Sequence, residues 1–541
     1  MPITNEETPL PPLQPRPPRW AALEPLKLPV FRMLWSTWLT ANVCMWMNDV
    51  AAAWMMTTLT TSPVWVALVQ SASTLPVFLL GLPSGALADI LDRRRWLVAT
   101  QFWLAGTAVL LCTAVALGWM SAPLLLALTF ANGIGLAMRW PVFAAIVPEL
   151  VPRTQLPAAL GLNGIAMNAS RIIGPLTAGV LIASAGSVWV FALNAVLCVA
   201  SGFVVLRWRR EHRPHPLGRE RLVSAMRVGV QFVRQSPRMR AVLVRIAVFF
   251  FHSTALLALL PLLARGLKGG GAGAFTVLLA SMGAGAIAAV LVMPRLRQAY
   301  GRDQLVMRGA ALHAAATAVM AVAPNVWVAV PAMFFGGAAW ITTANSLSVS
   351  AQLALPDWVR ARGMAMYQMA IMGASAFGAA LWGQVAQLST VQTGLLVAAV
   401  SGTVVMWLAI RWVTDRVGED DVSPAQAGWA AGPPPEAPAE GGRVLVTVEY
   451  VIDPARAAAF HLVMQHTRRA RLSEGAIGWE LLHDVGQPER YVEQIMDESW
   501  TEHQRRFTRA TAADMALRER RLAFHRGEAP PVVTRYVITP W

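Results

Sequence analysis

Charged residues are scarce in this 541-residue chain. They make up 14% of the sequence, whereas soluble domains carry about 25%. Hydrophobic residues make up 55%, and the mean hydropathy is +0.48. This composition excludes a soluble globular protein as a description of the whole chain, and a multi-span membrane protein is the class that fits.

Cysteine and lysine are almost missing. The cysteines, Cys44, Cys112 and Cys198, fall in apolar runs without the spacing of metal ligands, so we expect packing roles, no metal and no cofactor. Only Lys27 and Lys268 are lysines, so the net charge of +15 comes from arginine. The arginines stand mainly between apolar runs, where they predict membrane orientation and lipid contact rather than nucleic-acid binding.

Long uncharged runs dominate the chain up to residue 413, and a helix needs about 20 such residues to cross a bilayer. Twelve runs are long enough: 31–57, 64–88, 96–118, 122–147, 158–184, 187–207, 241–264, 273–293, 304–323, 325–353, 364–386 and 390–413. Arginine-bearing loops alternate with loops of little charge, which predicts both termini in the cytoplasm and a location in the cell inner membrane.

The arginine-rich segment 208–240 divides these spans six and six. Residues 1–30 are Pro-rich and lack a signal-peptide pattern, so we predict a cytoplasmic tail there. Six-helix bundles follow at 31–207 and 241–413, joined by a cytoplasmic loop at 208–240. Apolar spacing between residues 222 and 234 favours an amphipathic helix on the bilayer, and a simple tether is the equal alternative.

A different composition follows the last span. Residues 414–442 are rich in proline and glycine, typical of a flexible linker. From 443 to 541 the charge content is that of a soluble domain. Strands are predicted at 444–451, 476–485, 489–498 and 532–538, and helices at 454–472, 499–508 and 510–526. This β-α-β-β-α-β order predicts a cytoplasmic, ferredoxin-like α+β domain.

The polar stretch between the first two spans carries a motif. Gly85, Asp89, Arg93 and Arg94 have a spacing that resembles the loop signature of the major facilitator superfamily. The variant with Asp92 before three arginines resembles the transmembrane secretion effector branch, which includes enterobactin exporters. The resemblance implies two pseudo-symmetric six-helix bundles and a conformational latch in this loop. Without it, the loop would be interpreted as an orientation signal only.

The fourth span departs from the superfamily's pattern. Exporters often carry an arginine ahead of a Gly-x-Gly pair, but here Thr129 precedes Gly133 and Gly135. Arg139 lies nearer the cytoplasmic side, where we expect it to pair with Asp89 in the latch.

One acidic residue, Asp49, lies deep in a predicted span. Placing a charge there costs at least about 2.5 kcal/mol, so its presence predicts a function. We expect Asp49 to bind the coupling proton or the substrate, or else to be the structural partner of Arg171 in the fifth span. His252 and His313 are alternative proton carriers, and a neutral hydrogen-bonded histidine is the alternative for each.

The fifth span resembles the superfamily's antiporter motif. Its residues are Gly161, Ser170, Gly174, Pro175 and Gly179, with Ser170 in place of a glycine. Small residues allow close helix approach and proline allows bending, so this helix is expected to seal the cavity.

The resemblance also places certain spans around a central cavity. Asn42, Trp46, Asn132 and Asn345 would offer it polar and aromatic contacts without charge. A large amphipathic solute fits such a lining better than a sugar or a phosphate.

The C-terminal domain resembles the antibiotic-biosynthesis-monooxygenase type, chiefly over residues 492–508. His461, Trp500 and His503 are the candidates for catalysis, but they form no triad, metal set or phosphate loop. We therefore predict dimerisation or regulation rather than an enzyme.

Together these patterns predict an exporter of a siderophore-like or drug-like molecule that works by alternating access and proton antiport. An importer on the same fold and a membrane-tethered oxygenase are the alternatives.

Overall fold

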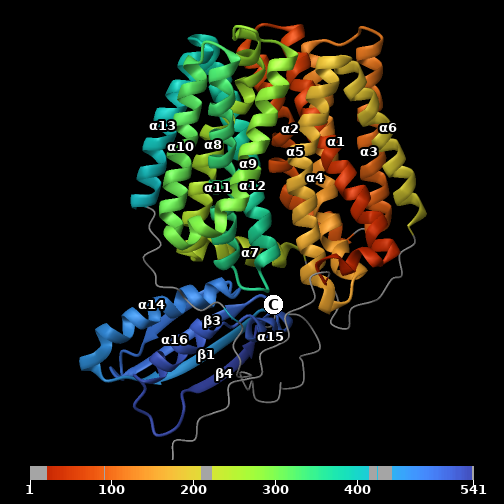
Figure 1. Cartoon of the computed structure of the whole chain (residues 1–541). Helices are drawn as coiled ribbons and strands as arrows, with labels where there is room; N and C mark the ends of the chain where they lie inside the picture. Colours follow the sequence, from red (N-terminus) through yellow and green to blue (C-terminus); the bar gives the residue numbers. More distant parts are fainter. Residues whose placement is uncertain (1–20, 91, 209–221, 413–422, 424–441, 539–541) are drawn as a thin grey trace, which may run out of the picture.

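The computed structural model describes residues 21–90, 92–208, 222–412, 423 and 442–538. Two helical bundles stand side by side above a smaller domain that contains a sheet (Figure 1). The predicted N-terminal tail and linker lie largely outside the described residues. We call the end of the bundles next to the sheet the domain end, and the opposite end the far end.

The N-terminal bundle is made of the helices α1 (Pro29–Leu59), α2 (Pro63–Ile90), α3 (Arg93–Ala116), α4 (Ala122–Leu150), α5 (Leu156–Ser184) and α6 (Ser187–Arg207). The C-terminal bundle is made of α8 (Pro237–Gly266), α9 (Ala272–Ala299), α10 (Arg302–Val322), α11 (Val326–Leu353), α12 (Arg360–Leu388) and α13 (Val391–Trp412). Helix α7 (Leu222–Gln235) connects the bundles.

Local sequence sets where these helices begin. Asp92 caps α3 by accepting a hydrogen bond from the Arg95 amide (2.9 Å), and Asn325 caps α11 through the Val328 amide (3.2 Å). Each cap satisfies an amide that the first helical turn leaves without an intrahelical partner. Proline starts α1 and α8, where its missing amide costs nothing.

Eleven of the described helices are long and apolar enough to cross a membrane. Helix α1 is not among them, although it has 31 residues. Its four tryptophans, its asparagines and Asp49 lower its mean hydropathy.

The hydrophobic core differs between the two ends of the bundles. At the far end one continuous cluster joins both bundles and includes Met56 of α1, Val66 of α2 and Leu263 of α8. At the domain end each bundle has a separate cluster, which includes Phe143 in the N-terminal bundle and Leu347 in the C-terminal bundle. The core cluster shared by the two bundles therefore lies at the far end, and contacts such as that of Phe78 with Phe377 continue the packing of α2 against α12 toward the domain end.

Helix α7 packs on protein. Val228, Phe232 and Val233 are buried, and the latter two belong to the core of the C-terminal bundle. The Phe232 ring meets the Trp358 ring edge-on, with centroids 5.7 Å apart. The apolar face predicted to lie on the bilayer is thus covered by the C-terminal bundle and the sheet domain, which corrects both the bilayer and the tether interpretations.

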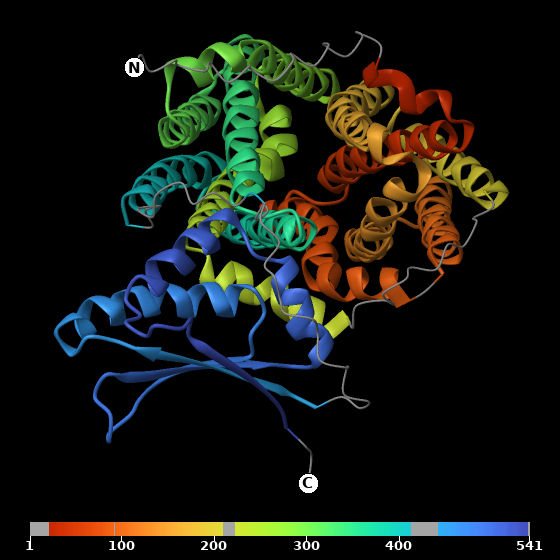
Figure 2. The same ribbon diagram turned by 90° about the horizontal axis from the view of Figure 1, so that it is seen from below.

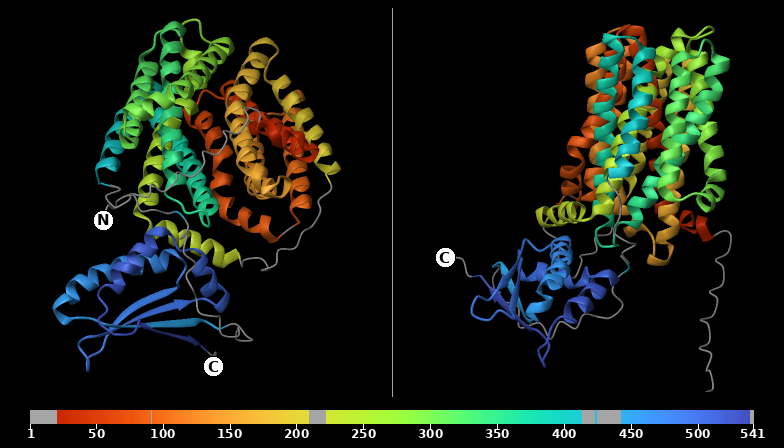
Figure 3. Two further views of the ribbon diagram at one scale, coloured as in Figure 1. Left: turned by 60° about the horizontal axis from the view of Figure 1, so that its bottom comes forward. Right: turned by 90° about the vertical axis from the view of Figure 1, so that its left-hand side faces the viewer.

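The C-terminal domain contains the strands β1 (Val444–Val451), β2 (Gly478–His483), β3 (Arg490–Asp497) and β4 (Val532–Val537), and the helices α14 (Ala457–Ser473), α15 (Trp500–Thr508) and α16 (Ala512–Leu522). The sheet has the order β2-β3-β1-β4, and all neighbouring strands are antiparallel. The helices lie on the side of the sheet that faces the bundles (Figure 3).

Seen from below, this domain lies against α7 and the C-terminal bundle (Figure 2). Arg227 of α7 forms an ion pair with Glu498 at 2.7 Å, and Gln231 donates to the Ala476 carbonyl at 2.7 Å. Arg509 lies over the ring of Trp358, which precedes α12, at 5.3 Å. These contacts connect the domain to α7 and to the C-terminal bundle.

Candidate functional site

Asp49 lies where the two bundles meet. Its Oδ1 accepts a hydrogen bond from the Ser73 hydroxyl of α2 at 2.9 Å. A cavity of about 10 Å³ beside it is also lined by Gln70 of α2 and by Leu257 and Ala258 of α8. The carboxyl group is therefore inside the protein at the junction of α1, α2 and α8, within the half of the molecule where the core is continuous.

Arg171 of α5 does not pair with Asp49. Its guanidinium carbon lies 5.4 Å from the centroid of the Trp46 ring and 4.8 Å from that of the Trp340 ring. Trp46 belongs to α1 and Trp340 to α11. The guanidinium is thus held by aromatic rings from both bundles, a cation–π arrangement worth about 0.5–2 kcal/mol per ring.

Two glycines of the helix-five motif bring α5 close to its neighbours. A Cβ at Gly174 would lie 2.9 Å from the Val43 carbonyl of α1, and one at Gly179 would lie 2.8 Å from the side chain of Thr276 on α9. The absence of side chains here permits close approach within the first bundle and across to the second. Pro175 lies inside the helix between them.

The other motif positions make no such contact. A Cβ at Gly161 would meet nothing within 4 Å, and the Ser170 hydroxyl donates to the Met167 carbonyl of its own helix at 3.0 Å.

Polar contacts close the far end between the bundles. Arg265 of α8 donates to the Thr57 carbonyl of α1 at 2.7 Å, and its guanidinium lies 4.9 Å from the Trp54 ring centroid. Ser62 donates to Gln387 at 2.7 Å. Together with the continuous core, these contacts seal the far end of the molecule.

His252 and His313 line one cavity of about 20 Å³ between α8, α10 and α13. The Nδ1 atom of His252 bonds the Val248 carbonyl at 2.8 Å, and that of His313 bonds the Gly336 carbonyl at 3.2 Å. The cavity belongs to the C-terminal bundle alone, so a movement between the bundles would not open or close it.

The residues predicted to line the central cavity differ in their burial and in their contacts. Asn42 is fully buried and donates to the Trp38 carbonyl of its own helix at 2.8 Å. Asn132 of α4 is buried and Asn345 of α11 is half-buried. Of this set, Trp46 lies against another predicted site residue, Arg171.

The latch loop is described in part. Gly85 and Asp89 fall in the last turns of α2, but their side chains lie outside the described residues. Arg94 donates to the carbonyls of Leu206 (2.9 Å) and Trp208, so it ties the start of α3 to the end of α6.

Arg139, the expected partner of Asp89, is buried in α4 with its guanidinium over the Trp38 ring at 5.3 Å. Arg93 is the first residue of α3.

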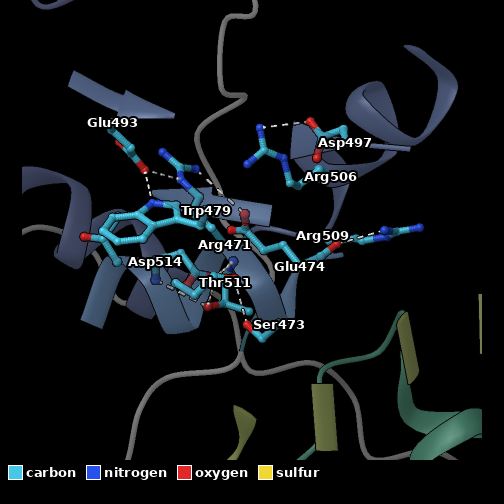
Figure 4. Close-up of polar contacts among 12 residues, drawn as sticks. Arg471, Ser473, Glu474, Trp479, Glu493, Asp497, Arg506, Arg509, Thr511 and Asp514 are labelled. Carbon is cyan, nitrogen blue, oxygen red and sulfur yellow. Dashed lines mark hydrogen bonds and ion pairs between the residues drawn. The ribbon is translucent and has the colours of Figure 1, made fainter. Parts of the chain in front are cut away.

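A buried ion network fills the C-terminal domain (Figure 4). Arg471 of α14 bonds Glu493 of β3 at 3.2 Å, and the Trp479 indole donates to the same carboxylate at 3.0 Å. Burial alone would raise the pKa of Glu493, but Arg471 and Arg521 lower it to about 2. Burial raises the pKa of Glu474 to about 7, with the Asp514 charge adding to the effect.

The residues proposed for catalysis are held by structural contacts. His503 is buried, with Nδ1 bonded to Asp497 at 2.7 Å and Nε2 accepting from Arg535 at 3.3 Å. The Trp500 ring packs at 5.5 Å from His503, whereas His461 packs on Tyr491. Both nitrogens of His503 are engaged, so neither is free to act on a substrate.

Sequence reasoning missed Ser73 and Trp340. Serine and tryptophan are common in apolar helices, and nothing in the sequence marks these two. Only the arrangement of α2 and α11 around Asp49 and Arg171 identifies them.

Several solved transporters share the fold. The nucleoside transporter NupG aligns over 71% of this chain and 98% of its own, with a TM-score of 0.56 and 14% identity. An inward-facing bacterial homologue of the human lysosomal transporter Spinster aligns over 73% and 96%, with a TM-score of 0.55 and 14% identity.

The curated relatives are named as transporters or efflux proteins, and each match covers only part of their length. An uncharacterized MFS-type transporter, YfiS of Bacillus subtilis, is 27% identical over 35% of this chain and 45% of its own length. The staphyloferrin A transporter of Staphylococcus aureus is 22% identical over 47% and 64%. Macrolide efflux protein A of Streptococcus pyogenes is 26% identical over 31% and 40%. The chain thus spans about half the length of the curated relatives it matches.

A family profile covers nearly the whole sequence. Residues 20–540 match the transmembrane secretion effector family. With its apolar helices and its two bundles, the chain belongs to this family and has the fold of the major facilitator transporters.

Proposed function

We propose that this transporter exports a small amphipathic molecule, siderophore-like or drug-like, by alternating access in exchange for protons. The observation that carries the proposal is the position of Asp49 at the junction of α1, α2 and α8, with a serine hydroxyl as its partner. An acid at this depth between apolar helices is accommodated more readily when neutral, so its protonation favours a closed junction.

The names of two relatives support the substrate class. One transports a siderophore, staphyloferrin A, and another is a macrolide efflux protein. A siderophore and a macrolide are both small molecules with polar and apolar parts. Export agrees with the name of the efflux relative. The alternative is an importer on the same fold, and the experiment must distinguish the two directions of transport.

We further propose that α1 is the twelfth span and that the domain end faces the cytoplasm of a cell inner membrane. Arginines at the domain end, among them Arg94, Arg240 and Arg295, support this orientation. At the far end the basic residues are Arg265, in the last turn of α8, and Lys268, in the loop that follows. Both chain termini then lie in the cytoplasm.

The loop from Gly85 to Arg94 is proposed as the conformational latch. Arg94 bonds two backbone carbonyls at the end of α6, so this part of the loop is anchored within the N-terminal bundle. Asp89 would then be the member that exchanges partners, with Arg139 or across the bundle boundary.

For the C-terminal domain we propose a ferredoxin-like fold with a regulatory or dimerising role. One sheet face is covered by α14 and its neighbours. The opposite face presents Leu445, Leu482, Val492 and Met496 together with the exposed Tyr536. Polar side chains, among them Glu480 and Gln494, stand between these apolar ones. A mixed face of this kind fits a second copy of the domain through its apolar side chains.

Inside-out vesicles with an imposed pH gradient test the proposal. Candidate molecules come from a growth-inhibition panel that compares expressing with non-expressing cells. Accumulation inside the vesicles, driven by an acidic interior, supports proton-coupled export. Accumulation without dependence on the gradient contradicts the coupling, and depletion of preloaded substrate supports import instead.

A further inference from the structure

Arg171 is a cation without a counter-ion. No hydrogen bond or ion pair of its guanidinium is found among the described residues, and its Nε is buried without a partner. Asp49, the acid expected to neutralise it, is bonded to Ser73 instead. An unpaired charge inside a protein is unfavourable, so the binding of an anion that the protein does not itself supply would stabilise the guanidinium.

The rings around Arg171 define how that anion can bind. Trp46 and Trp340 hold the guanidinium through cation–π contacts at 5.4 and 4.8 Å. A cation–π contact uses no hydrogen bond, so the N–H donors at the edge of the guanidinium remain for an acceptor. A carboxylate matches that edge with two parallel hydrogen bonds.

The site also lies in the right place for a transported molecule. Arg171, Trp46 and Trp340 each stand near the middle of their helices, α5, α1 and α11. The first two belong to the N-terminal bundle and the third to the C-terminal bundle, so the group is shared across the boundary. A ligand bound there would contact both halves of the molecule.

We propose that the substrate carries a carboxylate or a comparable planar oxyanion, and that Arg171 binds this group between Trp46 and Trp340. This inference rests on the proposed transport function and narrows its substrate to anionic amphipathic molecules. A neutral amphipath can accept hydrogen bonds from the guanidinium but brings no negative charge, and a cationic one is repelled by it, so both would leave the charge of Arg171 uncompensated.

Binding to the purified full-length protein tests the inference without transport. The protein, in an uncharged detergent free of anionic lipid, is screened for thermal stabilisation by aromatic carboxylic acids, by citrate-type polycarboxylates and by the methyl ester of each. We expect stabilisation by the acids and its loss in the esters. Equal stabilisation by acids and esters, or no stabilisation by any acid, overturns the proposal.

Variants assign the effect to the residue. Arg171→Gln should weaken binding of the acids about tenfold or more, because the charge-assisted bonds are lost. Arg171→Lys should weaken it less, and this variant keeps the test valid if the glutamine variant does not fold. Arg411→Gln is the matched control, since Arg411 also lies over a tryptophan ring, that of Trp407 at 5.4 Å, but near the end of α13 and away from the proposed site. Unchanged binding in Arg171→Gln overturns the inference.

A second comparison separates this inference from the proposed function. An acid that binds through Arg171 but is not moved by a pH gradient in inside-out vesicles refutes proton-driven export and leaves the anion site standing. Gradient-driven accumulation of esters or amines, unaffected by Arg171→Gln, supports export and refutes the anion site. Added anionic phospholipid that displaces the acids would assign the site to a lipid headgroup and refute the substrate role.

Discussion

At the scale of single residues, Asp49 is the group whose charge can change at the junction of the bundles. Asp49→Asn is expected to abolish gradient-driven transport while the protein still reaches the membrane, since an amide cannot exchange a proton. Ser73→Ala should retain transport with an altered pH profile, because the carboxyl group stays and only its hydrogen-bond partner is lost. Transport rates in inside-out vesicles measure both. Unchanged transport in Asp49→Asn removes this residue from the coupling role.

Glu474 makes the stability of the C-terminal domain depend on pH. Its pKa rises from 4.5 to about 7 on folding. A raised acid pKa means that stability is full below about pH 4.5 and is lost as the pH rises through about 7. Glu474→Gln should therefore stabilise the domain at about pH 8, by roughly 1–3 kcal/mol, and change little at about pH 5. Hydrogen exchange of the β1 and β3 amides in the full-length protein measures this.

Glu493→Gln is the control of opposite sign for that experiment. The pKa of Glu493 falls to about 2 on folding, so its charge stabilises the domain above about pH 4.5 and the effect is lost as the pH falls through about 2. This variant should exchange faster at about pH 8, where Glu474→Gln exchanges more slowly. The same direction of change in both variants would contradict the assignment.

At the scale of elements, α7 joins the sheet domain to the C-terminal bundle. Arg227→Glu should loosen this contact, because it places two acids together at a former 2.7 Å ion pair. Both side chains are about one third exposed, so the effect should be modest, about 1 kcal/mol or less. Hydrogen exchange of α7 measures it. The charge-reversed pair Arg227→Glu with Glu498→Arg should restore protection, and a failure to restore it would show that the ion pair does not hold the domain.

The sequence predicted where single strands and helices begin and end better than it predicted which parts of the protein they pack against. The strand predicted at 444–451 has the bounds of β1, because strand preference is a property of the local sequence. The amphipathic spacing likewise locates α7. It does not say what covers the apolar face, since lipid and a protein surface select the same residues. The C-terminal bundle and the sheet domain decided that question through Phe232 and Val233.

The candidate site could likewise be predicted from the sequence only in part. Hydropathy alone singles out Asp49, since a buried charge is rare enough to be noticed. Its bond to Ser73 and the position of Arg171 between Trp46 and Trp340 depend on how four helices cross, and no local pattern records that. The expected pairing of Asp49 with Arg171 failed for this reason, because equal depth in neighbouring helices does not fix which side chains face each other.

At the scale of the whole molecule, the open face of the sheet predicts self-association. Leu482→Glu and Val492→Glu together should shift the purified full-length protein from dimer to monomer, because charge on this face opposes its burial. Light scattering of the detergent-solubilised protein measures the mass. Gln387→Glu, a similar change at the far end, should have no such effect. A wild-type protein that is monomeric at every concentration would contradict the prediction.

The whole molecule is described with its far end closed and with separate cores at its domain end. The two bundles share one apolar cluster at the far end, so they can separate there only if the contacts of this cluster break. Asp49 lies beside this cluster, so its charge state and the far-end contacts are expected to change together.

The most direct measurement is the distance between spin labels at Thr61 and Ser389, two exposed far-end positions, in protein whose three cysteines are replaced. The wild type should show a far end that is closed at acidic pH and open at alkaline pH, where Asp49 has lost its proton. In Asp49→Asn the distance should stay short at both pH values. An opening with pH that is the same in the wild type and in Asp49→Asn would contradict the coupling of this carboxyl group to the movement of the bundles.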